Sequence, residues 1–193
     1  MLYIIIIAIC WLVFAGMQTA FLPYGFFQSL LWTVAATAAV VVLDALTASV
    51  SRMLPAKWLP REAKIFEVNA KEKRFYEKLK IRKWKDRIPE IGHFTGFRKN
   101  KLDEPKSLAY LERFLLECRY GEVGHFFSCL IGFLILLPLP FLPRPWLAFS
   151  LPVAIVNVLL NLPSLLILRY NSYKLKILYV STKKKEERAA TAA

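Results

Sequence analysis

The chain has 193 residues, of which 56% are hydrophobic and 21% charged, and its mean hydropathy is +0.41. A soluble domain of this length cannot bury so much apolar mass, so the composition favours a lipid bilayer as the solvent. The formal net charge of +13 does not indicate nucleic acid binding, because the lysines and arginines lie beside long apolar runs. An anionic membrane surface, or a phosphate-bearing substrate at that surface, is the partner that fits.

Two long apolar runs open the chain, at residues 2–22 and 26–50, with a Pro-Tyr-Gly turn between them. Each run is long enough to cross about 30 Å of hydrocarbon at about 1.5 Å per residue. The first run has no basic segment ahead of it and no small-residue cleavage site. We therefore expect it to be retained as a transmembrane helix rather than removed as a signal peptide.

A polar, strongly basic region follows, with 19 Lys or Arg against 10 Asp or Glu from Arg52 to Arg119. Apolar residues recur in it at roughly helical spacing in two stretches, first Phe75, Leu79, Trp84 and Ile88, then Leu108, Leu111, Leu115 and Cys118. The first pattern predicts a helix lying in the membrane interface, and the second an amphipathic helix that leads into the next apolar run. We expect this region to lie against the bilayer.

Two more apolar runs, at residues 121–137 and 146–170, are joined by a proline-rich link, and the tail from residue 171 is basic. The predicted fold class is an all-α integral membrane protein with about four transmembrane helices. Its parts are membrane helices at 1–51, a basic interfacial region at 52–120, membrane helices at 121–170 and a tail at 171–193. The positive-inside rule then predicts a multi-pass cell-membrane protein with both termini and the basic loop in the cytoplasm.

Glu122 and His125 stand at the start of the third apolar run, three residues apart, which places them on one face of a helix. Ionisable groups near membrane depth are costly and usually face a cavity. His125 is therefore a candidate general base for an attacking hydroxyl, with Glu122 fixing the imidazole tautomer or stabilising the imidazolium. The alternative is that both are interfacial residues satisfied by neighbouring helices.

Other polar residues of the apolar runs have two interpretations each. Asn157 and Asn161, one helical turn apart, fit interhelical hydrogen bonds, and Asn161 fits a site equally well. Arg169 is a candidate to bind a carboxylate, phosphate or oxyanion, or else an anchor at the interface. Asp44, the only charge in the first two runs, pairs with a basic residue of the polar region or joins the site.

We predict no metal, cofactor or disulfide. Glu122, His125, His93 and Asp44 have no ligand spacing that makes a closed metal set. The cysteines are odd in number and widely spaced, at positions 10, 118 and 129, which fits neither a disulfide framework nor a zinc site. Motifs for nucleotide binding or a nucleophile elbow are also missing from the sequence.

Three blocks of residues resemble the glycosyl-4,4'-diaponeurosporenoate acyltransferases, the family of the last enzyme of staphyloxanthin biosynthesis. They are Ile-Arg-Lys-Trp-Lys-Asp-Arg-Ile at 81–88 behind Phe75-Tyr76, Gly-Glu-Val-Gly-His-Phe at 121–126, and Asn161-Leu162-Pro163 running into Leu-Arg-Tyr-Asn at 168–171. The resemblance runs from about the second apolar run to about residue 178. Residues 2–22 and the prolines around Pro140 stand out as additions to the family pattern.

The resemblance implies transfer of a fatty acyl group, from an acyl-CoA co-substrate, to a sugar hydroxyl of a membrane glycolipid, carotenoid-like or other. His125 and Glu122 are then the catalytic pair. The implied substrate-binding residues are Arg169, Asn161, Tyr170, Asn171, Arg82, Lys83, Trp84 and Lys85. Expected partners are a lipid or glycolipid acceptor, the acyl donor and anionic lipid headgroups, with no nucleic acid. The competing hypothesis is a non-catalytic lipid-binding or scaffold protein, in which Glu122, Asn161 and Arg169 only pack helices.

Overall fold

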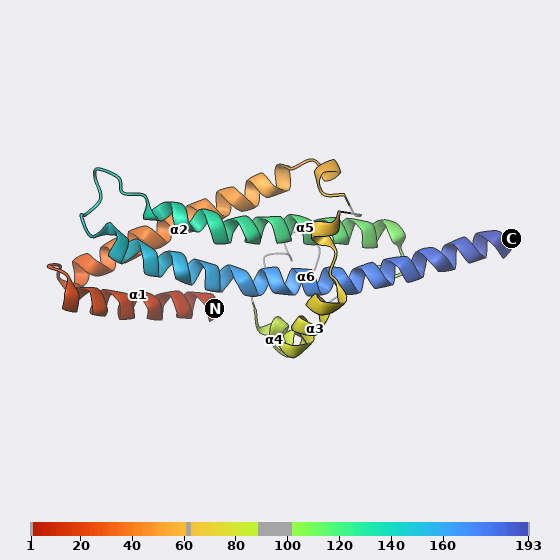
Figure 1. Cartoon of the computed structure of the whole chain (residues 1–193), viewed down its shortest axis with the longest axis horizontal. Helices are drawn as coiled ribbons and strands as arrows, with labels where there is room; N and C mark the ends of the chain where they lie inside the picture. The colour runs from red at the N-terminus through yellow and green to blue at the C-terminus, as the bar shows by residue number, and fades with distance from the viewer. Residues whose placement is uncertain (1, 61–62, 89–101, 193) are drawn as a thin grey trace. The chain divides into compact units, whose positions relative to one another are not determined.

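The computed structural model describes residues 2–60, 63–88 and 102–192, and every regular element within them is a helix (Figure 1). In chain order these are α1 (Leu2–Phe21), α2 (Phe26–Met53), η1 (Ala56–Trp58), η2 (Lys64–Phe66), α3 (Ala70–Lys78), α4 (Ile81–Trp84), η3 (Lys85–Arg87), α5 (Leu108–Ile131), η5 (Gly132–Leu136) and α6 (Trp146–Ala192). The predicted all-α class is confirmed for the described part of the chain.

Three of the described helices are long and apolar enough to cross a membrane, over Tyr3–Phe21, Phe26–Met53 and Trp146–Thr191. The third apolar run begins within α5, which starts at Leu108 and so joins the amphipathic stretch to that run, and it continues from Gly132 in η5. No proline interrupts α5, and its two glycines weaken a helix without ending it. Because α5 is not among the three, the expected fourth crossing stays a prediction.

Helix α6 continues well past the predicted end of the fourth run at residue 170, through the basic tail to Ala192. Its first half contains Pro152, which has no backbone N–H to offer the carbonyl one turn earlier, that of Ala148. The side-chain amide of Gln18 in α1 donates to this carbonyl at 2.9 Å. The hydrogen bond that the proline removes is replaced from a neighbouring helix, as buried backbone in lipid requires.

The chain divides into two compact units that differ sharply in charge. The first, which we call the apolar unit, comprises Met1–Val50 and Gly124–Leu162, and the second, the basic unit, comprises Ser51–Val123 and Pro163–Ala193. Asp44 and Arg144 are the only charged residues in the sequence of the apolar unit. The end of α5 from residue 124 and the start of α6 up to residue 162 thus belong to the apolar unit, and the rest of both helices belongs to the basic unit.

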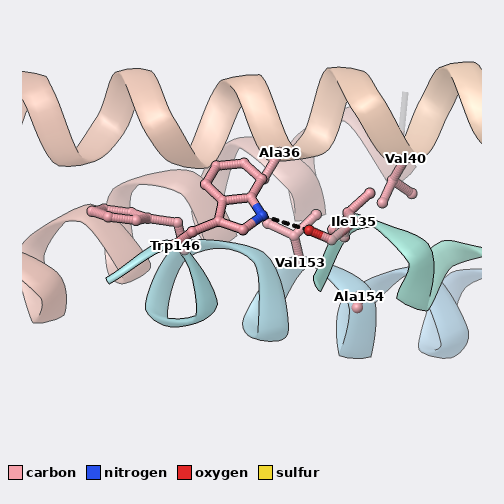
Figure 2. Close-up of a cluster of buried hydrophobic side chains, with 7 residues drawn as sticks. Ala36, Val40, Ile135, Trp146, Val153 and Ala154 are labelled. Carbon is pink, nitrogen blue, oxygen red and sulfur yellow. Dashed lines mark hydrogen bonds between the residues drawn. The ribbon is translucent and has the colours of Figure 1, made fainter. Parts of the chain in front are cut away.

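The core of the apolar unit lies around the indole of Trp146, whose Nε1 donates to the Ile135 carbonyl at 2.5 Å (Figure 2). This bond ties the two ends of the proline-rich link together. Outward-facing apolar side chains remain largely uncovered, for example Phe21 at 82% and Phe27 at 83% exposed, as expected of a surface that contacts lipid. The buried core residues are Ala36, Val40, Ile135, Trp146, Phe149, Val153 and Ala154.

The basic unit has two apolar clusters on α6. One confirms the amphipathic stretch at the start of α5: Leu111, Leu115 and Cys118 are buried with Phe114 against Leu175 and Tyr179, and Leu108 packs at the edge. The other holds Tyr76 and Ile81 with Ile167 and Tyr170, and Trp84 and Ile88 pack against it.

The first predicted stripe does not form one continuous helical face. Helix α3 ends at Lys78, and Lys80 adopts a left-handed conformation with φ of 53° before α4 begins, a conformation uncommon for a residue other than glycine. The break separates the stripe, so Phe75 is 51% and Leu79 is 39% exposed, while Trp84 and Ile88 turn toward the core. Only the first half of the stripe is free to contact a membrane.

Candidate active site and its supporting ion-pair network

His125 is held in the apolar unit by a chain of hydrogen bonds from three helices. Its Nδ1 lies 2.8 Å from Oδ1 of Asn161 in α6, and Nδ2 of Asn161 donates to Oδ2 of Asp44 in α2 at 3.0 Å. Asn161 is buried, and His125 and Asp44 are partly exposed. The structure therefore brings two of the predicted site residues, His125 and Asn161, into direct contact. It also places the Asp44 carboxylate against Asn161, and among the described residues Asp44 makes no ion pair with a basic side chain.

A second asparagine completes this cluster. Asn157, one turn before Asn161, accepts from Nδ2 of Asn161 through both its carbonyl, at 3.2 Å, and its Oδ1, at 2.9 Å. Its own Nδ2 donates to the Ser128 carbonyl at 3.1 Å and to Oδ1 of Asp44 at 3.4 Å. The interhelical hydrogen bonding expected of Asn157 is thus present, and it serves the same cluster.

Glu122 has partners of a different kind in the basic unit. Its Oε2 accepts from Nη1 of Arg169 at 3.3 Å, its Oε1 accepts from the Ser172 hydroxyl at 2.6 Å, and its side chain is 3% exposed. Three residues on, His125 has Asn161 as its hydrogen-bond partner. The sequence hypothesis gave the orienting role to Glu122, and that role stays a prediction. The hydrogen-bond partner that the structure shows for His125 is the amide oxygen of Asn161.

Arg169 is the centre of an ion-pair network in the basic unit. Its Nε and Nη2 donate to the two carboxylate oxygens of Glu72 in α3, at 2.5 and 3.0 Å, and its Nη1 also donates to the Ile65 carbonyl at 3.0 Å. Tyr76 donates its hydroxyl to the same Glu72 carboxylate. The guanidinium is therefore occupied by protein acceptors on both of its sides, and its side chain is 20% exposed.

The pKa values in α3 reflect this network. Burial raises the pKa of the Glu72 carboxyl, but hydrogen bonds from Arg169 and Tyr76, and the charge of Arg169, outweigh it and hold that pKa below its ordinary value. Burial and the hydrogen bond to the Glu72 carboxylate raise the pKa of the Tyr76 hydroxyl. Glu72 is therefore ionised and Tyr76 protonated at neutral pH.

The remaining predicted substrate-binding residues lie in the basic unit. Tyr170 is buried, meets Tyr76 edge to face at 6.5 Å between ring centroids, and has the Lys174 amino group 4.5 Å from its own ring centroid. Asn171 is also buried. In the basic block, Arg82 and Lys83 are exposed, Lys85 is partly exposed, and the Trp84 indole donates to the Leu79 carbonyl at 2.9 Å.

Sequence reasoning missed Glu72, Tyr76 and Ser172 as partners of the predicted residues. Glu72 is one of many charges in its segment, and only the Glu72-Tyr76 spacing of one turn hints at a pair. His93, considered for a metal site, lies outside the described residues. Within those residues, no group of three or more His, Cys, Asp or Glu side chains is placed to hold a metal ion.

Comparison with known proteins gives one family match. The model of the glycosyl-4,4'-diaponeurosporenoate acyltransferase family matches residues 55–181, which is about two thirds of this chain and includes Glu122, His125, Asn161 and Arg169. Asp44 precedes the matched segment. Neither a curated protein nor a solved structure was found to match the chain.

Proposed function

Because this chain belongs to the glycosyl-4,4'-diaponeurosporenoate acyltransferase family, we propose that it is a membrane O-acyltransferase. The reaction moves a fatty acyl group from acyl-CoA to a sugar hydroxyl of a membrane glycolipid of the glycosyl carotenoid-like class. The three apolar helices that are long enough to cross a membrane suit an acceptor of this kind, because such a substrate stays dissolved in the bilayer.

His125 is the general base of this proposal. Its Nε2 takes the proton of the acceptor hydroxyl as that oxygen attacks the thioester carbonyl carbon, forming a tetrahedral intermediate. The C–S bond then breaks, the ester remains on the sugar, and the coenzyme A thiolate leaves with the proton returned by the imidazolium. Each turnover consumes one thioester and one alcohol, yields one ester and one thiol, and restores neutral His125.

The observation that carries the proposal is the hydrogen bond between His125 Nδ1 and Asn161 Oδ1, at 2.8 Å. An amide oxygen accepts and cannot donate, so the facing Nδ1 carries the ring proton. Nε2 is then left with its lone pair, as a base requires. A histidine oriented through one nitrogen, with the other left for a substrate proton, is the arrangement expected of a catalytic imidazole.

The test is a transfer assay on the purified chain with radiolabelled acyl-CoA and a total lipid extract that contains glycosylated carotenoids. A new labelled lipid that releases its label on mild alkaline hydrolysis supports an O-acyltransferase. Acyl-CoA or lipid that binds without transfer overturns the proposal and favours the non-catalytic lipid-binding protein.

We propose that the cations around α4 hold the phosphates of the acyl donor. Replacing Lys80, Arg82, Lys83 and Lys85 by glutamine is expected to raise the KM for acyl-CoA and to change kcat little, because these charges attract the donor without touching the acyl group. Raised salt should raise the wild-type KM and have less effect on the variant, since exposed charges are screened over about 10 Å at 0.1 M. Replacing Lys183, Lys184, Lys185 and Arg188 of the exposed tail by glutamine serves as the charge-matched control. An unchanged KM in the four-residue variant would assign donor binding to another surface.

We propose that the basic unit and both termini face the cytoplasm of a multi-pass cell-membrane protein. The test is maleimide labelling of single cysteines in a variant that lacks Cys10, Cys118 and Cys129. Positions 56 and 184, both exposed in the basic unit, should react only after the cells are permeabilised. Position 141 in the proline-rich link, 75% exposed, should react in intact cells. Labelling of position 56 from outside would reverse the orientation.

A further inference from the structure

We propose that Asp44 is a positioning residue for the base, acting through Asn161 to fix the proton of His125 on Nδ1. This inference rests on the proposed function, because it explains how the imidazole keeps Nε2 free for the acceptor hydroxyl. Asp44 precedes the segment that matches the family, so the match assigns it no role. Its place in the apolar unit, as one of only two charged residues there, itself calls for a physical explanation.

The carboxylate of Asp44 determines which groups of the cluster donate hydrogen bonds and which accept them. An ionised carboxylate accepts hydrogen bonds only, so both groups facing it must be donors. Those groups are Nδ2 of Asn161, 3.0 Å from Oδ2, and Nδ2 of Asn157, 3.4 Å from Oδ1. Asp44 therefore sets the orientation of both amides at once.

The orientation of Asn161 is determined by more than one neighbour. If its amide were turned over, its oxygen would face Oδ2 of Asp44 as well as the carbonyl and Oδ1 of Asn157, which are all acceptors. Amide orientations are assigned from hydrogen-bond networks of this kind. With Nδ2 turned toward Asp44, Oδ1 of Asn161 must face Nδ1 of His125, and Nδ1 must be the donor.

A glycine makes room for the second amide. A β-carbon added at Gly132 would lie 2.4 Å from Nδ2 of Asn157, too close for any side chain. Nδ2 of Asn157 is held there by the Ser128 carbonyl and by Asp44, so it cannot move aside without losing these bonds. By contrast, a β-carbon at Gly16 in α1 meets nothing within 4 Å.

A purely structural role for these residues makes a different prediction. Interhelical hydrogen bonds stabilise helix packing whichever nitrogen of His125 holds the proton, so loss of Asp44 would lower stability and leave the tautomer unchanged. A positioning role requires the tautomer to change. In Asp44→Asn, the amide nitrogen at position 44 can donate, so one of the acceptors that oppose the turning of Asn161 is lost. Part of the population can then turn over and donate to Nδ1 of His125. In those molecules the ring proton moves to Nε2, and the base is lost.

The experiment is nitrogen-15 NMR of histidine-labelled protein in lipid bilayers, at a pH where imidazole is neutral. Comparison with His125→Asn protein identifies the His125 signals. We expect protonated Nδ1 and unprotonated Nε2 in the wild type, and a substantial Nε2–H population in Asp44→Asn. Restored Nδ1–H is expected in Asp44→Asn with Asn161→Asp, because a carboxylate at position 161 only accepts. A wild-type Nε2–H tautomer, or an unchanged tautomer in Asp44→Asn, overturns the inference.

Turnover separates this inference from the proposed function. kcat should fall in proportion to the loss of the Nδ1–H tautomer, with KM nearly unchanged. If Asp44→Asn does not accumulate, Asp44→Ala provides the test, because it removes the carboxylate from Asn161 without placing another polar group there, and an unchanged tautomer in Asp44→Ala overturns the inference. If the tautomer shifts as expected but His125→Asn keeps its turnover, the positioning stands and the proposed function falls.

Discussion

His125→Asn is expected to lower turnover at least about 100-fold, the lower end of what general-base catalysis supplies. The fold should survive, because the asparagine amide can donate to Oδ1 of Asn161, which lies 2.8 Å from Nδ1 of His125. Asparagine has no basic nitrogen, so the variant removes the chemistry and keeps the contact. The measurement is labelled acyl transfer per folded molecule, with folding followed by thermal unfolding in detergent.

His125→Ala provides the matched comparison, since it removes both the base and the hydrogen bond. The two variants should lose similar turnover, and the alanine variant should also melt earlier. If the asparagine variant keeps more than about a tenth of wild-type turnover, the loss falls below the range for a general base, and the base lies elsewhere.

Adding Glu122→Gln decides between the two possible partners of the base. The sequence hypothesis treats Glu122 and His125 as one catalytic unit, so the double variant would be little worse than His125→Asn alone. In the structure Glu122 accepts hydrogen bonds from Arg169 and Ser172, so we expect the losses of turnover from the two changes to be independent. We therefore expect the effects of the two changes on the activation free energy to add.

Arg169→Leu is expected to destabilise the folded protein by about 3–5 kcal/mol, as when one partner is removed from a buried ion pair. The reason is that two carboxylates lose their counter-charge together: Glu122, which is 3% exposed, and Glu72, which is 21% exposed. Arg169→Lys should recover only part of this loss, because an ammonium group cannot bridge both oxygens of Glu72 as the guanidinium does. The measurement is equilibrium unfolding in detergent.

Lys176→Ala is the control, about two turns further along α6. Lys176 donates to Glu67 at 2.7 Å, but both side chains are well exposed, at 43% and 56%, so its removal should change stability little. The sequence hypothesis, in which Arg169 binds substrate, predicts the reverse: an unchanged unfolding transition in Arg169→Lys with a lower kcat/KM. That result would contradict the proposed role of Arg169 in the stability of the folded protein.

The same network should make the protein sensitive to acid. The pKa of Glu72 is lower in the folded protein than its ordinary value of 4.5, because burial, which raises it, is outweighed by the hydrogen bonds from Arg169 and Tyr76 and by the charge of Arg169. Its contribution is therefore fully present above pH 4.5 and is lost as the pH falls through the lower folded value. In Glu72→Gln, the free energy of unfolding should fall less steeply as the pH is lowered. The pKa of Glu67 is lowered by Lys176, so this pair also contributes to the loss of stability in acid. Because both side chains are exposed, raised salt should weaken that contribution.

The sequence by itself determined the helical class and the basic region, and it singled out the polar residues within the apolar runs. Long apolar runs and two amphipathic stretches predict helices in a membrane. A histidine and two asparagines are unusual within such runs. The family resemblance based on the short blocks is confirmed by the match over residues 55–181. The fusion of neighbouring segments into α5 and α6 was not evident, because the change from polar to apolar composition does not by itself end a helix.

Only the tertiary structure decided which residues are partners. The three-residue spacing of Glu122 and His125 fixes a shared helical face, but it says nothing about the helices that approach that face. Asp44 reaches Asn161 across 117 positions of the sequence, and Glu72 reaches Arg169 across 97. Such pairs depend on how separate helices pack, which local spacing does not encode. For this reason the sequence marked His125 as a candidate base, while its hydrogen-bond partners became visible only in the folded chain.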